Sequence, residues 1–321
     1  MAREIPYIQA IMEAITEEMQ RDPNVIFYGQ EQAVSDEDPM VVAFGRKRVR
    51  PTPISETAEI GMAVGAAMVG LRPVVELLMT DFILVALDQV VNEAARVYFK
   101  TAGRVKVPIV LKAGYGFAAG WSVQHANCWY NLFMGVPGLK VVVPSTAADA
   151  KGLMKAAIRD DNPVLYLHHY MLTLVPGPVP DGDVVVPIGV ADVKRPGRDV
   201  TVIATGWMVQ RSLEAADLLA REGIDVEVVD PRSLAPLDVD TLVASVEKTR
   251  RVVLVDQAPR HASAAALIAA EITERAFGAL AAPPRLVTAL DTSVPYSKPL
   301  EDAVIPSVER IVQAVREVVQ A

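Results

Sequence analysis

The spacing of apolar residues along the chain predicts its secondary structure. Short runs rich in valine, isoleucine and leucine predict buried strands, and apolar residues that return every three or four positions predict helices. The two kinds of segment alternate along the whole chain, which is typical of an α/β protein with mainly parallel sheets. The predicted strands are 25–28, 74–78, 107–112, 140–143, 164–168, 200–204, 225–230 and 251–256. The predicted helices are 8–21, one from about residue 56, 81–100, 146–159, 208–221, 237–248, 263–277 and 304–320.

One stretch interrupts this alternation. The run LVPGPVPDGDVVVPIG concentrates proline, glycine and aspartate and has no helical period, so it predicts a linker. The chain has 321 residues, more than the ~100–200 of a typical domain. We therefore predict two doubly wound α/β domains, over residues 1–175 and 188–321, joined by a linker over 176–187.

Composition and charge narrow the class of partner. The formal net charge of −8 disfavours nucleic acid, and we interpret the basic run at 46–50 as a solvated turn. A single cysteine excludes a disulfide framework within the chain and fits a reducing compartment, so we expect a cytoplasmic protein. The acid-rich amphipathic N-terminus does not resemble a targeting peptide, and no apolar run reaches the ~18–20 residues that span a membrane.

Several common catalytic motifs are missing. The chain has neither GxxxxGK[ST] nor GxGxxG, and its one approach to a nucleophile elbow, Gly120-Trp121-Ser122-Val123-Gln124, fails at the last position. Four histidines and one cysteine lack the spacing of a zinc site. The chemistry of an enzyme with this sequence must therefore come from a bound cofactor or a partner chain.

An acidic residue opens the most apolar helix. In PISETAEIGMAVGAAMVG no charged residue follows Glu59, and glycine and alanine dominate as they do where a helix approaches other backbone closely. One interpretation is capping, with Ser55 as the N-cap and Glu56 and Glu59 near the positive end of the helix dipole. The other is that Glu56 has a function in an apolar place.

Several segments carry a resemblance that favours the second interpretation. The runs TPISE, GMAVGAAMVGLRPVVELLMTDF, DQVVNEAA, QHANC and SVPYSKPLEDAVIPS, in this order, resemble the β subunit of the thiamine-diphosphate-dependent 2-oxo acid dehydrogenases. These are the first components of the pyruvate, branched-chain and acetoin dehydrogenase complexes, and the run VVLVDQAPRHASAAALIAAEI is most similar to the acetoin branch. The resemblance spans nearly the whole chain. It implies a transketolase-like pyrimidine-binding domain followed by a transketolase C-terminal-like domain.

The resemblance also implies a cofactor and partners. In that family an α2β2 tetramer binds thiamine diphosphate at the α/β boundary, and the α subunit holds the diphosphate and Mg²⁺ through a GDG motif. This chain has no GDG, as expected of the β subunit. The tetramer decarboxylates a 2-oxo acid or cleaves acetoin, and the acyl group then passes to a lipoyl-bearing acyltransferase.

The site residues follow from the same resemblance. Glu56 faces N1′ of the aminopyrimidine, where burial raises its pKa and strengthens its hydrogen bond to the ring. Phe82 stacks near that ring and Leu78 is its apolar neighbour, although core packing would explain either residue as well. His125 lies at the mouth of the site and assists acyl transfer; the alternative is a loop histidine bonded to the backbone. Ala157, Asp160 and Asn162 correspond to residues that bind K⁺ through their carbonyls, and the alternative is an ordinary helix end.

Other residues lack a function or depart from the family. We interpret His168, His169 and His261 as structural. The loop before TPISE is several residues shorter than usual, Gln30 replaces an acid of the hydrogen-bond network behind the cofactor, and HANC stands where HSQ is usual. These departures leave two rivals open. One is a thiamine-dependent ketol or acyl transferase with a different acceptor, and the other is a non-catalytic scaffold subunit.

Overall fold

The chain forms two compact units. The computed structural model describes residues 3–30, 35–117, 120–261 and 263–321. The first unit consists of Met1–Tyr115 and Leu132–Ile188, and the second of Gly116–Asn131 and Gly189–Ala321. Residues 116–131, which the sequence assigns to the first domain, thus group with the second unit. The boundaries 1–175, 176–187 and 188–321 stay a prediction about independently folding domains.

A parallel sheet forms the core of the first unit. Its strands lie in the order β6-β7-β5-β4-β2-β3, and every neighbouring pair is parallel. Each strand leaves the sheet at the same edge, so the loops after them gather there, where ligands bind in open α/β sheets. The strands are β2 (Val25–Gln30), β3 (Val49–Thr52), β4 (Arg72–Met79), β5 (Val110–Tyr115), β6 (Lys140–Val142) and β7 (Val164–His169).

The helices of this unit confirm most of the sequence pattern, with one exception. The predicted continuous helix over 81–100 changes its winding several times, and Ala95 N donates to Val90 O at 3.0 Å in the i→i+5 manner of a π-helix. A regular 3.6-residue period cannot reveal such an inserted residue. The segments are α4 (Thr80–Ile83), η1 (Leu84–Ala86), η2 (Asp88–Ala94) and α5 (Val97–Lys100). The others are α1 (Tyr7–Arg21), α2 (Pro39–Phe44), α3 (Glu56–Met68), α6 (Tyr130–Met134), α7 (Ala147–Arg159) and η4 (Tyr170–Leu172).

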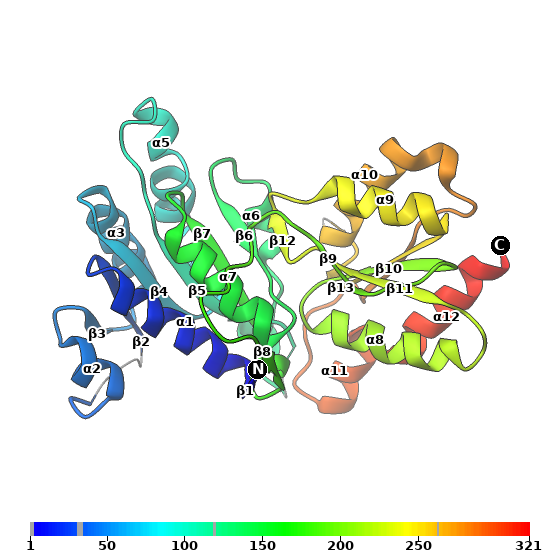
Figure 1. The fold of residues 1–321 in the computed structure, drawn as a ribbon, viewed down its shortest axis with the longest axis horizontal. Coiled ribbons are helices and arrows are strands. Elements are labelled where there is room, and N and C mark those ends of the chain that lie inside the picture. The colour runs from blue at the N-terminus through cyan, green and yellow to red at the C-terminus, as the bar shows by residue number, and fades with distance from the viewer. Residues whose placement is uncertain (1–2, 31–34, 118–119, 262) are drawn as a thin grey trace. The chain divides into compact units, whose positions relative to one another are not determined.

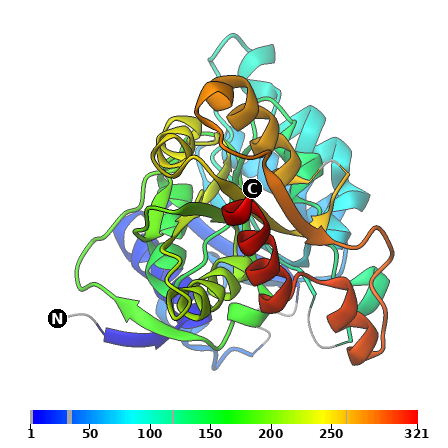
Figure 2. The same ribbon diagram turned by 90° about the vertical axis from the view of Figure 1, so that its right-hand side faces the viewer.

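The predicted linker contains a strand. In Figure 2 the blue strand β1 (Arg3–Pro6) lies beside the green strand β8 (Pro176–Val179), and the two pair antiparallel. The prolines of β8 concealed it, because proline is normally read as a break; a two-stranded ribbon consists of edge strands, where proline is tolerated. The start of the predicted linker is therefore tied to the N-terminus.

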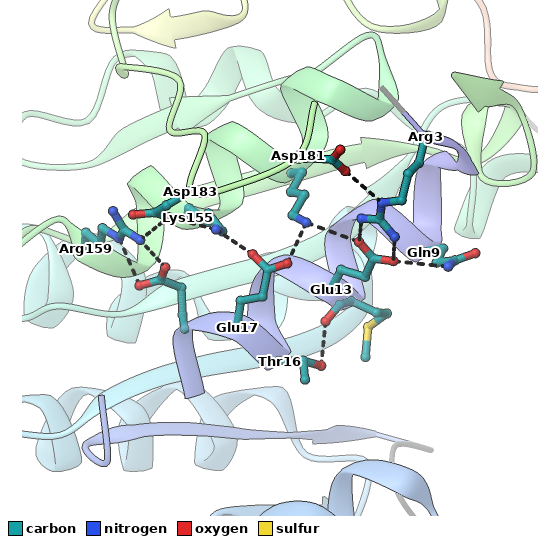
Figure 3. A network of polar contacts seen from close by, with 12 residues as sticks. Arg3, Gln9, Glu13, Thr16, Glu17, Lys155, Arg159, Asp181 and Asp183 are labelled. Atoms are coloured by element: carbon teal, nitrogen blue, oxygen red, sulfur yellow. Dashed lines mark hydrogen bonds and ion pairs between the residues drawn. The ribbon is translucent and has the colours of Figure 1, made fainter. Parts of the chain in front are cut away.

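Ion pairs join α1 to α7. Figure 3 shows acidic residues of α1 facing basic residues of α7. Lys151 and Lys155 lie 2.6 and 2.5 Å from the Glu17 carboxylate, and Arg159 lies 2.5 Å from Glu18. The basic residues are four apart, so they share one helix face. Glu18 is buried, and these contacts give its charge the partner that burial requires.

The second unit is a mixed sheet covered on both faces. Its strand order is β14-β13-β10-β11-β9, and all neighbours are parallel except β9, which is antiparallel to β11. Figure 1 shows α8 and α12 on one face and α9 and α10 on the other. The strands of this sheet are β9 (Asp192–Arg195), β10 (Val200–Ala204), β11 (Val226–Asp230), β13 (Val252–Pro259) and β14 (Arg285–Ala289). The short strand β12 (Ser233–Ala235) lies outside this sheet. The helices are η3 (Ser122–Gln124), α8 (Trp207–Ala220), α9 (Val239–Thr249), α10 (Ala264–Ala276), η5 (Phe277–Ala279), α11 (Lys298–Val304) and α12 (Val308–Gln320).

The predicted fold class is confirmed, since both units are α/β with mainly parallel sheets. Within the described ranges, no helix combines the length and the apolar character needed to cross a membrane.

Candidate active site

Glu56 opens α3 from a nearly buried position. Only 7% of its surface is exposed, and the helix it begins buries Ile60, Ala63 and Val64. Ser55 occupies the N-cap position, but its side chain makes no capping hydrogen bond. Side-chain capping by Ser55 therefore does not explain this helix start, although the helix dipole still favours an acid in the first turn.

One amide joins two buried carboxylates. Gln30, at the end of β2, is 1% exposed, and its Nε2 lies 2.9 Å from Glu56 Oε1 and 3.2 Å from Glu59 Oε2. An amide nitrogen carries two hydrogens, so it can donate to both carboxylates at once. Thr52 donates a further hydrogen bond to Glu59 Oε1 at 2.7 Å. Among the described residues, Gln30 is the only hydrogen-bond donor to the Glu56 carboxylate.

The carboxyl group of Glu59 has a raised pKa. Burial raises the pKa of its carboxyl, and the charge of Glu56 raises it further, while hydrogen bonds from Thr52 and Gln30 lower it in part. A raised pKa means that Glu59 holds its proton to higher pH than an exposed glutamate. The arrangement therefore limits the negative charge that accumulates beside Glu56.

Gly29 fixes where Gln30 lies. A Cβ at Gly29 would come within 2.3 Å of the Glu76 carbonyl oxygen in the neighbouring strand β4. No other residue type fits this close approach of the two backbones. Because Gln30 follows Gly29 directly, this close contact between β2 and β4 determines which turn of α3 the Gln30 amide reaches.

Leu78 and Phe82 lie where β4 leaves the sheet. Leu78 has φ +52°, a left-handed conformation that is strained for a branched side chain. The Tyr170 hydroxyl donates to the Leu78 carbonyl at 2.9 Å and supports this turn. Phe82 follows in α4, and both side chains are half-buried. Since β4 neighbours β2, the structure brings this turn and Gln30 to the same edge of one sheet.

Comparison with known proteins identifies the family. The pyrimidine-binding domain of transketolase matches residues 3–173, and the C-terminal domain of transketolase matches residues 189–311. The beta subunits of acetoin:2,6-dichlorophenolindophenol oxidoreductase from Cupriavidus necator and Bacillus subtilis are 43% and 41% identical to this chain, over 99% of it and 98% of each relative. The beta subunit of the bovine mitochondrial pyruvate dehydrogenase E1 component is 40% identical over 98% of this chain and 91% of its own length. The chain belongs to this E1 β-subunit family.

A solved structure supports the fold of this β subunit. A split-gene transketolase, described as an inactive beta4 tetramer, superposes with a TM-score of 0.82 and covers 98% of both chains. At 24% identity, this likeness concerns the fold alone.

His125 of the β subunit belongs to the second unit. It follows η3, and its side chain is half-buried. Nearby Ser122 has φ +61° and donates from Oγ to the Val294 carbonyl at 2.9 Å. The nearness of His125 to Glu56 stays a prediction.

The predicted K⁺ ligands of the β subunit form one turn at the end of α7. Asp160 Oδ1 accepts hydrogen bonds from the backbone and the side chain of Asn162, both at 2.9 Å, and Asp160 N donates to Ala157 O at 3.3 Å. Arg72 donates to the Asp160 carbonyl at 2.6 Å and to Ile158 O at 2.8 Å. In the part of the chain that the structure describes, no three His, Cys, Asp or Glu side chains form a metal-binding group. Because the expected ligands are carbonyls, the K⁺ site stays a prediction.

The remaining histidines differ in environment. His168 and His169 are buried at the end of β7. Burial, and then the charge of Lys112, hold the pKa of His168 well below its ordinary value, so it stays neutral. His261 is exposed and lies 3.4 Å from Asp291.

The sequence did not predict two features of the first unit. It left Glu59 without a partner, although a second acid one turn after Glu56 was a visible signal. It also missed the buried ion pair of Glu76 on β4 and Lys112 on β5, which face each other in register. A single charge inside each of two apolar strands is the signal that could have found it.

The raised pKa of Glu59 predicts a pH dependence of stability. Between the ordinary glutamate value of about 4.3 and the raised pKa, the folded state binds more protons than the unfolded state. The free energy of unfolding should therefore fall as pH rises through this window. Glu59→Gln removes the effect, so its stability relative to the unmodified protein should increase with pH. Urea unfolding from about pH 4.5 to pH 8 measures this, and a difference that stays constant would contradict the assignment.

Proposed function

We propose that this chain is the cytoplasmic β subunit of a thiamine-diphosphate-dependent enzyme that decarboxylates a 2-oxo acid or cleaves acetoin and passes the acyl group to a lipoyl domain. The observation that carries the proposal is the nearly buried Glu56 at the start of an apolar helix, held by Gln30. The names of the relatives support the reaction class, since they include acetoin and pyruvate dehydrogenase subunits.

The residues present fit the pyrimidine end of the cofactor. Glu56 has one carboxylate oxygen bonded to Gln30, which leaves the other for a ring nitrogen. Leu78 and Phe82 are half-buried at the edge where parallel strands end, and they supply an apolar contact for a flat ring. When bound, thiamine diphosphate supplies a carbon nucleophile and an electron sink for cleavage beside a carbonyl.

Glu56 acts on one atom of that ring. Its carboxyl group holds a proton at N1′ through a hydrogen bond, and a water-poor setting strengthens this bond. Gln30 fixes the carboxylate, and a proton on Glu59, whose pKa is raised, would reduce the negative charge beside it. The α subunit would hold Mg²⁺ and the diphosphate, because this chain has no GDG motif.

Exposed apolar side chains support assembly with an α subunit into an α2β2 tetramer. Ile54, Met62, Val69, Val85 and Phe99 of the first unit are all exposed, and Phe99 is 90% exposed. An α subunit that covers such side chains would remove their apolar surface from water, which favours association. The acyltransferase would meet the tetramer as a separate protein.

His125 has the acyl-transfer role in this proposal. In that step the lipoyl S–S bond breaks, one sulfur takes the acyl carbon and the other takes a proton. The disulfide is reduced as the acyl carbon is oxidised. Imidazole is the side chain that most often acts as a general acid in proteins, and His125 would supply this proton.

A panel of substrates and acceptors tests the proposal. The chain is co-produced with its α subunit and assayed with acetoin, pyruvate and branched-chain 2-oxo acids, using either 2,6-dichlorophenolindophenol or a lipoyl domain as acceptor. We expect turnover of at least one substrate with both acceptors. Turnover with the dye but with no lipoyl acceptor would favour a transferase that uses another acceptor, and no turnover at all would favour a scaffold subunit.

A further inference from the structure

The segment that carries His125 packs with the second unit although it lies between two parts of the first unit in the sequence. We call residues 116–131 the His125 segment. It follows β5 and precedes most of α6, both of which contain residues of the first unit. Its described contacts with the second unit occur on both sides of His125.

The strongest anchor lies after His125. Tyr130 is fully buried, and its hydroxyl donates to Asp256 Oδ1. Asp256 lies within β13. Its carboxylate also accepts hydrogen bonds from Ala258 N at 2.8 Å and Ala265 N at 3.0 Å. A buried carboxylate with this many donors is rigidly held, and hydrogen bonds to a charged group are about twice as strong as neutral ones. Tyr130 is therefore attached to a fixed point of the second unit.

Two polar contacts hold the segment before His125. The Ser122 hydroxyl donates to the Val294 carbonyl at 2.9 Å, and Gly120 N donates to Glu301 Oε2 at 3.3 Å. Gly120 has φ +85°, and a Cβ there would lie 3.2 Å from the Tyr296 carbonyl oxygen. The segment thus passes close to the backbone of the 294–301 region.

An apolar contact completes the attachment. Phe117 and Ala126 are buried in a cluster with residues from the C-terminal part of the chain, against which Trp207 packs. Ala126 is the residue next to His125, so this cluster fixes the backbone beside the imidazole. The other buried members are Ala289, Val294, Val304 and Ile305.

We propose that the second unit positions His125 for acyl transfer, and that Tyr130 is a positioning residue that acts through its bond to Asp256. This inference rests on the proposed function of His125. Loosening the segment leaves the pyrimidine site of the first unit unchanged and displaces the imidazole that serves the lipoyl acceptor. The dye accepts electrons without acyl transfer, so its reaction does not need a precisely placed His125.

Tyr130→Phe tests the proposal in the α-containing complex. The variant keeps the ring and removes the hydroxyl. Hydrogen exchange of amides in the His125 segment should speed up by about tenfold to a hundredfold, as expected for loss of a hydrogen bond to a charged group. The ratio of lipoyl-linked to dye-linked turnover should fall by about tenfold. Tyr166→Phe is the matched control, because its buried hydroxyl donates to Ala150 O within the first unit at 2.8 Å and neither readout should change.

A second variant tests the same segment independently, in case Tyr130→Phe does not fold. Ser122→Ala removes the bond to Val294 on the other side of His125 and should change both readouts in the same direction. Unchanged exchange in both variants would overturn the proposal, and so would equal losses of dye-linked and lipoyl-linked turnover. If the unmodified complex turns over no substrate, the proposed function fails, while the exchange data still decide whether Tyr130 and Ser122 anchor the segment.

Discussion

Glu56→Gln should lower dye-linked turnover by about 10²–10⁴-fold, the usual range for loss of a positioned acid or base. Glutamine has nearly the shape of glutamate but cannot exchange a proton with a ring nitrogen at neutral pH. The other buried carboxyl bonded to Gln30, that of Glu59, lies one turn further along α3, so it does not have the placement of Glu56. Steady-state turnover with the best substrate of the panel measures the effect.

Glu59→Gln is the matched control. It makes the same chemical change one turn further along α3, in a side chain that is also buried and also bonded to Gln30. We expect less than about a tenfold loss, because Glu59 influences the reaction only through the charge around Glu56. Equal losses in the two variants would contradict the assignment of the proton-holding role to Glu56.

Lys112→Met should destabilise the first unit by about 3–5 kcal/mol, the cost of leaving a buried charge without its partner. Lys112 and Glu76 are both buried and paired across β5 and β4, in the middle of the sheet. Removing the ammonium leaves the Glu76 carboxylate in an apolar setting. Urea unfolding followed by circular dichroism measures the change in free energy.

Replacing both partners separates charge from packing. The double variant Glu76→Leu with Lys112→Met has no buried charge, and it should recover most of the lost stability. Lys298→Met removes one member of an exposed pair with Asp302 and should cost less than about 1 kcal/mol. A double variant as unstable as Lys112→Met would show that volume, not charge, explains the loss.

The sequence predicted regular elements well and irregular ones poorly. The helix that begins at Glu56 and the strands around residues 25–28 and 164–168 were confirmed, because a single apolar period describes each of them. The pairing of β1 with β8 was missed, since it joins residues far apart in the chain and uses prolines. The π-helical segment Asp88–Ala94 was missed because it breaks the 3.6-residue period.

The candidate site was also predicted only in part from the sequence. The resemblance selected Glu56, Leu78 and Phe82. The structure brings the turn that carries Leu78 and Phe82 to the edge of the sheet where Gln30 lies, and Gln30 bonds to Glu56. The resemblance marked Gln30 as the replacement of an acid in the hydrogen-bond network behind the cofactor. It did not show that the Gln30 amide bonds to Glu56 and Glu59, which lie 26 and 29 positions away. Nor could the sequence show that the His125 segment groups with the second unit, because that follows from tertiary contacts such as Tyr130 with Asp256.

Calorimetric titration with thiamine diphosphate and Mg²⁺ tests the central claim most directly. The titration is made on this chain alone and on its complex with the α subunit. We predict binding by the complex only, with one cofactor for each β chain and a requirement for Mg²⁺. Binding by the chain alone would contradict a site shared between subunits, and a complex that binds none would contradict the role of Glu56 as a cofactor-binding residue.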